Sequence, residues 1–262
     1  MNAQRRWKMA AAFVTAAIVA AGMAVAPGAA EPGAVESGPA EQSTGLRARK
    51  GPVTSHGVRA GEPAKPLVTH LPSAKFIGTP RELKSHARLE PYDAEKVRPA
   101  FLIPEGCTNL ARGKPVTSSD TLPIIGELEL VTDGDKRAGD GAYVELAPGL
   151  QWVRIDLQRR CRMYGILFWH YHAAARVYHD VVVQVSDDPD FIDGVRTVYN
   201  NDYDNSAGLG LGRDLEYVDD YQGRLIDAGG VCGRYVRLYS AGSTDGDPNH
   251  YIEVEVHGKA VE

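Results

Sequence analysis

The sequence predicts an all-β fold in which short strands pack as two antiparallel sheets. Many short segments rich in Val, Ile, Tyr and Trp alternate apolar with polar residues, which is the period of a half-buried strand. Turn-forming Gly, Asp, Pro and Asn separate these segments. Beyond the N-terminal region no long segment repeats apolar residues at the i, i+3, i+4 spacing of a helix. An antiparallel sandwich or jelly roll is therefore expected.

Ten strands are expected along the chain, and the alternation is clearest where Val153, Ile155 and Leu157 share one face and where Val181, Val183 and Val185 do the same. In order, the expected strands are Leu128–Thr132, Tyr143–Leu146, Gln151–Leu157, Tyr164–His172, Asp180–Ser186, Thr197–Asn200, Leu215–Tyr217, Leu225–Asp227, Arg234–Tyr239 and Tyr251–His257. The last of them carries Glu253 and Glu255 on one face. Acidic side chains within a strand need a reason, and a bound cation is one candidate.

Residues 1–30 have the layout of a secretory signal peptide. Arg5, Arg6 and Lys8 precede an uncharged, Ala-rich stretch from Met9 to Ala26, and small residues follow at 28–30 as a cleavage site. An uncleaved membrane anchor is the alternative, because the apolar run is near the lower limit of about 17–25 residues for a spanning helix. We expect cleavage, since the run ends in Ala, Gly and Pro.

The next segment, residues 31–105, is expected to be a disordered or extended linker. Residues 31–64 are rich in Gly, Pro, Ala, Ser and Glu, so they bury too little apolar surface to offset the entropy lost on ordering. Residues 65–105 carry many prolines and no sustained period, and part of them is expected to lie along the domain surface as an extended arm. The remainder, residues 106–262, has the length of a single domain.

The net charge argues against nucleic acid and anionic membrane as partners. The 262-residue chain has 29 Lys and Arg against 34 Asp and Glu, a net charge of −5. Cleavage after residue 30 would lower Lys and Arg to 26 and leave −8. An acidic chain of this kind is compatible with neutral ligands and with cations.

Six motifs in order resemble the discoidin family, also called the coagulation factor 5/8 type C domain. They are Asn109–Ser118, Val131–Asp135, Gln151–Leu157, Val183–Asp188, Arg234–Leu238 and Ile252–Gly258, and together they cover about residues 107–259. The resemblance implies a galactose-binding-like jelly-roll β-sandwich. It also implies a binding module rather than a catalyst.

A structural calcium site is the first feature that the resemblance implies. Its ligands would be the Leu130 carbonyl, Asp133, Asp135 through its carbonyl, and Glu253 from the last strand. Carboxylates and carbonyls on a tight Asp-Gly turn are the oxygen ligands that calcium prefers. The alternative is an ordinary turn, with Glu253 exposed or paired to an arginine.

A sugar site on the loops at one end of the sandwich is the second. Such sites combine an aromatic platform with planar polar groups. The candidate ligand residues fall in two loops and are His172, Arg176, Tyr178, His179, Asn249 and His250. The alternative is that they satisfy their own backbone. A zinc site at His170, His172 and His179 is disfavoured, because no carboxylate or cysteine lies nearby at a standard spacing.

Two features depart from the family. The loop from Tyr199 to Tyr221 is longer and more polar than usual; its Asp202, Asp204 and Ser206 have the spacing of an EF-hand start, but the glycine and the glutamate that would complete the motif are missing. The disulfide between the chain ends is absent. By the family's topology Cys161 and Cys232 could lie close enough to bridge, which leaves Cys107 free or paired between chains.

The function expected is an exported, non-catalytic carbohydrate-binding module for a neutral or galactose-like glycan, with calcium as structural support. The alternative is an adhesion or scaffold module that binds protein or a cell surface. A hydrolase is not expected, because the sequence has no nucleophile elbow, no HExxH and no catalytic carboxylate pair placed by motif. The expected location is secreted, periplasmic or at the cell surface, without membrane insertion after signal cleavage.

Overall fold

The computed structural model describes residues 52–76 and 83–261, which belong to one compact unit. The predicted signal peptide and residues 31–51 lie outside the described residues. Within the described ranges, the model contains no helix with the length and apolar character needed to cross a membrane.

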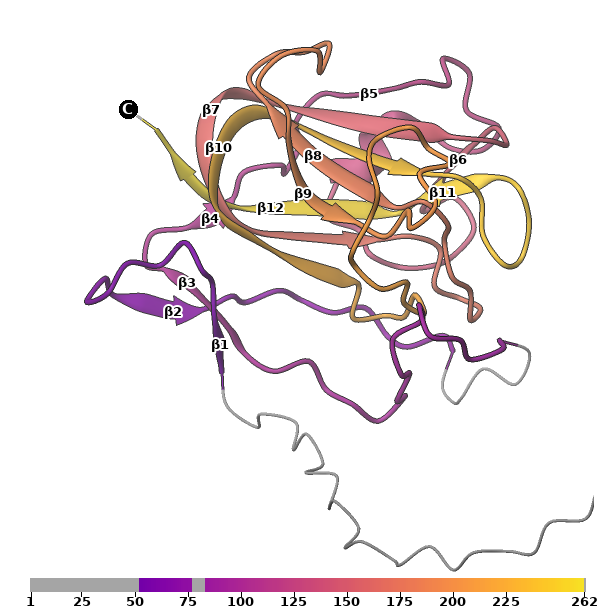
Figure 1. The fold of residues 1–262 in the computed structure, drawn as a ribbon, viewed down its shortest axis with the longest axis horizontal. Coiled ribbons are helices and arrows are strands. Elements are labelled where there is room, and N and C mark those ends of the chain that lie inside the picture. Colours follow the sequence, from indigo (N-terminus) through magenta and orange to yellow (C-terminus); the bar gives the residue numbers. More distant parts are fainter. Residues whose placement is uncertain (1–51, 77–82, 262) are drawn as a thin grey trace, which may run out of the picture. The chain divides into compact units, whose positions relative to one another are not determined.

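Two long, bent strands join the two sheets of a sandwich (Figure 1). β7 (Gln151–Trp169) and β10 (Arg224–Ser240) run antiparallel to each other. The first half of β7 pairs with β5 (Val116–Ser118), and the second half of β10 pairs with β8 (Val182–Ser186), which pairs with β9 (Arg196–Asn200). The second half of β7 pairs with β12 (Glu253–Ala260), and β12 pairs with β4 (Thr108–Asn109). The all-β sandwich predicted from the sequence is confirmed.

The bend explains why four predicted strands are only two. The register of β10 against β7 shifts between Asp227 and Val231, where Gly229 and Gly230 have φ of 60° and 78°. A bulge of this kind lets a strand turn from one sheet into the other without ending. The segments predicted as Leu225–Asp227 and Arg234–Tyr239 are therefore one strand, as are Gln151–Leu157 and Tyr164–His172, although the second of these ends at Trp169.

The core lies between the two sheets. Val153, Ile155 and Val236 from one sheet and Ile166 and Val254 from the other are fully buried in one cluster. Facing apolar side chains of this kind supply about 25 cal/mol for each Å² of apolar surface removed from water.

Two of the predicted strands, at 128–132 and 215–217, are wrong. Residues Leu128–Thr132 form a 3-10 helix, η1, rather than a strand, because the Leu130 amide donates to the Glu127 carbonyl three residues earlier. β6 (Val144–Leu146) and β11 (Asn249–Tyr251) form a separate two-stranded sheet. The predicted strand at 215–217 makes only an isolated bridge, in which Glu216 pairs with Leu89.

The N-terminal part of the described chain packs on the outer face of the sheet that contains β12, the second half of β7 and the first half of β10. We call this sheet the second sheet. We call residues 52–76 and 83–104 the arm. It contains β1 (Val53–Thr54), β2 (Ala64–Pro66) and β3 (Phe101–Pro104), paired in the order β1-β3-β2. Phe101 and Leu67 of the arm form an apolar cluster with Tyr164 and Leu225 of the sandwich. The arm is extended and packs against the sandwich, including residues 52–64, for which the sequence analysis expected disorder.

Candidate functional site

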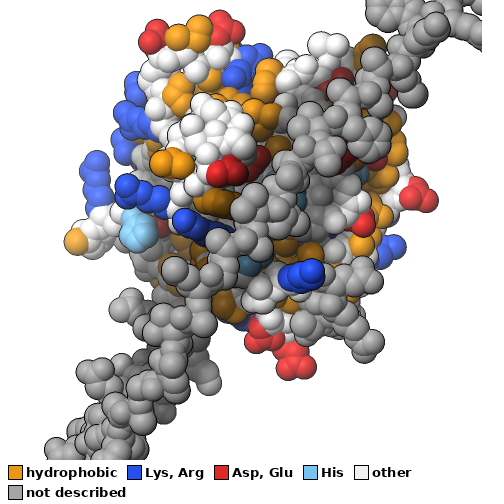
Figure 2. Space-filling view, turned by 45° about the vertical axis from the view of Figure 1, so that its right-hand side comes forward, with side chains coloured by type: hydrophobic (Ala, Val, Ile, Leu, Met, Phe, Trp, Pro, Cys, Tyr) orange, Lys and Arg blue, Asp and Glu red, His pale blue; other side chains and the backbone are white. Residues whose placement is uncertain are grey.

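The loops that follow β7, β9 and β10 gather at one end of the sandwich, together with β6 and β11. Figure 2 turns this end, on the right of Figure 1, toward the viewer, and shows acidic, basic and apolar side chains interspersed on that face. We call it the loop end. It is the region in which the sequence placed the sugar site.

Three partly exposed aromatic rings lie together at the loop end. The ring centroids of Tyr143 and Tyr171 are 5.1 Å apart in an edge arrangement, and His250 lies 5.7 Å from Tyr143 and 5.8 Å from Tyr171. Tyr143 precedes β6, His250 is in β11 and Tyr171 follows the end of β7. Three separate segments therefore build one aromatic platform.

Arg176 provides the positive charge of the platform. Its guanidinium lies 4.8 Å from the centroid of Tyr171, and its Nη2 donates to the Asp245 carboxylate at 2.5 Å. Stacking on an aromatic ring holds the planar group in one orientation while the outer N–H groups stay directed along its edge. The side chain is 10% exposed, against 59% for Asp245, so the ion pair closes over the arginine at the surface.

His250 is neutral at pH 7 and connects the platform to the layer beneath. Burial and the positive charge of Arg176 lower its pKa to about 4. The Tyr178 hydroxyl is 2.9 Å from its Nδ1, and the Glu145 carboxylate is 3.2 Å from its Nε2. A neutral ring satisfies both contacts when Nδ1 accepts from Tyr178 and Nε2–H donates to Glu145.

The structure places only some of the six predicted sugar residues at the platform. Arg176 and His250 reach the platform, and Tyr178 supports it from below, with only 1% of its surface exposed. His172 is 1% exposed and bonds through Nε2 to the Lys136 carbonyl. His179 lies apart, bonded to Glu216 of the long loop.

Asn249 has a purely internal role. Its carboxamide oxygen accepts from Ser240 and Gly242, and its nitrogen donates to the carbonyls of Ala147 and Gly149. With all of these bonds made and the residue fully buried, no donor or acceptor remains for a ligand. Asn249 holds the turn between β6 and β7 against the turn after β10.

The sequence reasoning missed Tyr143, Tyr171 and Asp245. Tyr171 lies between the two histidines that drew attention, and the histidines are the buried members: His170 and His172 are 0% and 1% exposed. Alternation along an extended segment then directs Tyr171 outward. The available signal was this alternation, read in the correct phase.

The predicted calcium turn brings some of its residues together. Glu253 is fully buried, its Oε2 accepts from the Gly134 amide at 2.8 Å, and its Oε1 has no hydrogen-bond partner among the described residues. Burial raises the pKa of this carboxyl to about 8. The Leu130 carbonyl accepts only a long bond, 3.5 Å, from the Asp133 amide. A buried carboxyl oxygen without a partner among the described residues is a group that an oxygen-seeking cation could bind.

The side chains of the other two predicted ligands, Asp133 and Asp135, already have partners in the protein. Asp133 accepts from the Asp135 amide at 2.7 Å, and the Asp135 carboxylate is held by Arg137. The side chain of Asp135 is therefore engaged, which leaves its carbonyl as predicted. Gly134 has φ of 82°, and the Arg112 guanidinium occupies the space that a Cβ there would need, so glycine is required in this turn.

A second acidic group lies on the long loop. In the part of the chain that the structure describes, Asp180, Asp202 and Asp204 form the one group of three metal-competent side chains whose ligand atoms lie within 4.8 Å of one another. Asp202 is buried and accepts from the Ser206 and Ala207 amides. The sequence showed Asp202 and Asp204 but not Asp180, which comes from the preceding loop.

The predicted disulfide is not formed. Cys107, Cys161 and Cys232 are all free. Cys161 is opposite Gly233 in the ladder and Cys232 is opposite Arg162, so the two cysteines are staggered by one residue. Because side chains alternate between faces, Cys161 points into the core while Cys232 faces the other side.

No family model and no curated protein matches this chain. Several solved structures have a similar fold. A fucose-binding module from Streptococcus pneumoniae is 19% identical over 57% of this chain and 96% of the module, with a TM-score of 0.41. Chitosan-binding module 1 of a chitosanase/glucanase from Paenibacillus sp. IK-5 is 20% identical over 57% of this chain and 98% of the module, with a TM-score of 0.38.

A family 89 glycoside hydrolase from Clostridium perfringens is 18% identical over 58% of this chain, with a TM-score of 0.44. This chain spans only 15% of the length of that hydrolase. All three structures are below 25% identity and below a TM-score of 0.5. The description of the fold given above therefore rests on the strand order and register of this chain.

Proposed function

We propose that this protein is an exported, non-catalytic carbohydrate-binding module whose binding face is the loop end. The observation that carries the proposal is the platform of Tyr143, Tyr171 and His250 with Arg176 stacked on it. Aromatic rings offer a face for the C–H side of a sugar ring, and planar charged groups at the rim bond its hydroxyls.

The polar groups around the platform suit a neutral sugar. Arg176 supplies N–H donors, while Asp245 and Glu145 supply carboxylate acceptors, so a hydroxyl can both donate and accept. The charges at the platform already pair with one another. A neutral ligand such as a galactose-like sugar adds hydrogen bonds without adding a net charge that the site would have to balance.

The proposal includes a calcium ion that stabilises the module. The ion would bind at the turn that carries Gly134, with Glu253 as its ligand from β12. The unpartnered Glu253 Oε1 is the feature that supports it. The ion would fix the segment between η1 and β6, which leads into Tyr143 of the platform.

A glycan array with the full chain tests the sugar proposal, run with calcium and with a chelator. Binding to a defined class of neutral sugar should be lost in Tyr171→Ala and kept in Ile192→Ala. Ile192 is the control because its side chain is 79% exposed and lies in the turn between β8 and β9, at the other end of these strands from the loop end. A blank array with folded protein, or equal loss in both variants, would refute the loop-end site.

Protein adhesion is the second candidate, favoured by a separate observation. Leu122 and Ile124 are 83% and 57% exposed, and the Ile124 amide bonds to the Glu145 backbone carbonyl, so this apolar loop adjoins the platform. Exposed apolar groups that lie together often mark a protein interface. Retention on a cell-surface protein that is lost in Leu122→Ser and unaffected by free sugar would favour adhesion; retention that free sugar abolishes would favour glycan binding.

A further inference from the structure

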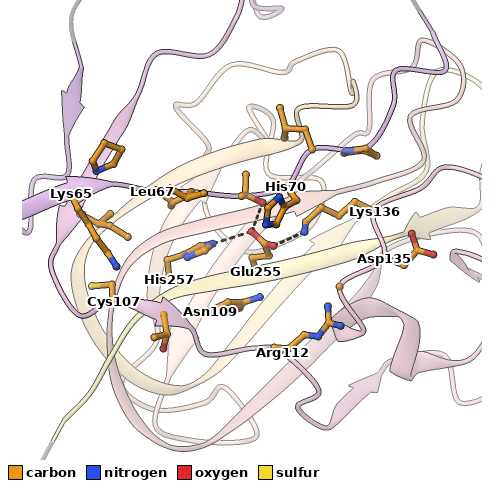
Figure 3. Close-up of a pocket in the computed structure, with 18 of the residues that line it drawn as sticks. Lys65, Leu67, His70, Cys107, Asn109, Arg112, Asp135, Lys136, Glu255 and His257 are labelled. Atoms are coloured by element: carbon orange, nitrogen blue, oxygen red, sulfur yellow. Dashed lines mark hydrogen bonds and ion pairs between the residues drawn. The ribbon is translucent and has the colours of Figure 1, made fainter.

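A groove separate from the loop end lies between the arm and the outer face of the second sheet (Figure 3). Arm residues 65–72 form one wall, and Glu255 and His257 of β12 form the floor. The opposite wall contains Asn109 and Arg112, and the turn 134–137 closes one end. The cavity measures about 630 Å³. This volume is in the range of about 300–1,000 Å³ that small-molecule sites occupy.

The floor is a closed polar network. The Glu255 carboxylate accepts from Lys136 Nζ at 2.7 Å, from His257 Nε2 at 3.0 Å and from the Thr69 hydroxyl at 3.0 Å. Burial alone would raise the pKa of Glu255, but the bonds from His257 and Lys136 lower it to about 2. The acid on the floor is therefore ionised and already neutralised by its own partners.

The walls carry cations without such partners. Four lysine and arginine side chains line the groove against two acids, and two pairs form: Lys136 with Glu255 and Arg137 with Asp135. Among the described residues, Lys65 and Arg112 make no ion pair or side-chain hydrogen bond. Figure 3 shows Lys65 extending from the arm and Arg112 from the opposite wall. The groove thus has an excess of positive charge in a chain whose net charge is −5.

The rest of the groove is mixed: the arm wall contributes apolar side chains such as Leu67 and Val68, and the opposite wall contributes neutral polar groups. The Asn109 oxygen accepts from the Ala111 and Val256 amides, which leaves its NH₂ group as a donor, and the preceding residue, Thr108, also lines the groove. A groove with a polar floor and two unpaired cations on facing walls suits a ligand that has many hydroxyls and at least one acid group.

We propose that this groove is a second ligand site, which binds the acid groups of an anionic glycan through Lys65 and Arg112. The acid group is a carboxylate or a sulfate, since an arginine fork and a lysine ammonium bond either. The site goes beyond the proposed neutral-sugar function, and it does not depend on the loop end. Because the arm supplies Lys65 and one whole wall, the site exists only while the arm is packed.

Isothermal titration calorimetry on the full chain tests the proposal with three named probes. These are a hexamer of galacturonic acid, a heparin-derived hexasaccharide and a neutral galactan hexamer. We expect one or both acidic probes to bind, more weakly at 150 mM than at 50 mM salt because exposed charges are screened. Uronate binding alone identifies a carboxylate ligand, and heparin-fragment binding alone identifies a sulfate ligand.

Three substitutions show where the acidic probe binds. Lys65→Gln and Arg112→Gln should each weaken binding at least about fivefold, the usual order for one charge-assisted contact. Arg159→Gln is the matched control: Arg159 is an exposed arginine at the bend of β7, outside the groove, and should change the affinity less than about twofold. All three residues are exposed, so their loss should leave the fold intact.

The two sites fail separately. Tyr171→Ala should abolish neutral-glycan binding and leave the acidic probe unaffected, while Arg112→Gln should do the reverse. No binding of either acidic probe at millimolar concentration would overturn the groove proposal and leave the loop end standing. Equal weakening by Arg159→Gln and Arg112→Gln would also overturn it, because the attraction would then be that of the whole surface.

Discussion

Glu253 and Glu255 lie two residues apart on β12, on the same face of the sheet, and both are buried, with 0% and 6% of their surface exposed. Their acidities nevertheless diverge. Burial raises the pKa of Glu253 to about 8, whereas hydrogen bonds from His257 and Lys136 overcome the effect of burial and lower the pKa of Glu255 to about 2. The difference follows from the partners: Glu255 has three side-chain donors, and Glu253 has one backbone amide.

The comparison separates two uses of a buried acid. Glu255 forms a network that ties the arm to the sandwich, because Thr69 comes from the arm and Lys136 from the turn before β6. Glu253 keeps one oxygen without a partner among the described residues, so burial keeps the carboxyl largely protonated at neutral pH until a cation binds. Of the two, only Glu253 is suited to bind a cation.

Removal of Lys136 should give the largest effect, because it would make Glu255 resemble Glu253. Lys136→Met keeps an unbranched side chain and removes the ammonium, which also lies 5.3 Å from the centroid of the Trp169 ring. Breaking a buried ion pair on one side costs about 3–5 kcal/mol, and since His257 and Thr69 remain, we expect a loss near the lower end, about 3 kcal/mol of the free energy of unfolding. Urea denaturation measures it.

Arg137→Met is the control for Lys136→Met. Arg137 is the next residue and is also paired, but its side chain is 77% exposed. An exposed pair contributes little because water solvates both charges. Equal losses in the two variants would contradict the view that the network around Glu255 stabilises the fold.

Calcium should have the next largest effect, and this effect should require Glu253. An ion that binds only the folded chain stabilises it by about 2.7 kcal/mol at one hundred times its dissociation constant. We expect calcium to raise Tm in calorimetry, and Glu253→Gln to abolish the increase, while Glu129→Gln, an exposed acid on η1, leaves it in place. An increase that persists in Glu253→Gln would direct attention to Asp180, Asp202 and Asp204.

The sequence predicts an element of the fold well when neighbouring residues determine that element. The alternation at Val181, Val183 and Val185 predicted β8 correctly, because burial on one face of a strand leaves a period of two in the residues themselves. The sequence did not predict in the same way that the segments at 225–227 and 234–239 belong to one strand, β10. Gly229-Gly230 has the composition of a turn, and only the partner strand shows that it is a bulge within a continuous strand.

The sites show the same limit. Glu253 was singled out from the sequence because an acid within an apolar strand is locally anomalous. Tyr171 was missed because its role depends on which side of the segment after β7 faces the core, and Arg112 because its neighbours, Gly134 and the arm, are distant in the chain. Residues whose function depends on assembly from separate segments leave no pattern along the sequence.

The dependence of stability on pH should sharpen the comparison further. For Glu253 the pKa rises from 4.5 when unfolded to about 8 when folded, so its contribution is full below pH 4.5 and is lost as the pH rises toward 8. For Glu255 the pKa falls from 4.5 to about 2, so its contribution is present above pH 4.5 and is lost as the pH falls toward 2.

Urea denaturation in calcium-free buffer from pH 5.5 to pH 7.5 isolates the first of these slopes. The wild-type chain should lose stability with a slope of at most about 1.4 kcal/mol per pH unit from this group, and Glu253→Gln should lack that component. Calcium should flatten the wild-type slope, because a bound cation favours the ionised carboxylate. A wild-type slope identical to that of Glu253→Gln would mean that Glu253 finds a partner in solution.

The smallest effect should come from the neutral member of the Glu255 network. Thr69→Val keeps the shape of the side chain and removes only the hydroxyl that donates to Glu255 Oε2. Because Lys136 and His257 still satisfy the carboxylate, we expect a loss of about 1 kcal/mol in urea denaturation. The same variant should loosen the arm over the groove, seen as faster amide hydrogen exchange at Leu67–His70, where Thr69 lies, but not at β12. If exchange at the arm stays as slow as in the wild type, then the apolar contact of Leu67 and Phe101 with Leu225 holds the arm. The hydrogen bond from Thr69 would then only satisfy the Glu255 carboxylate.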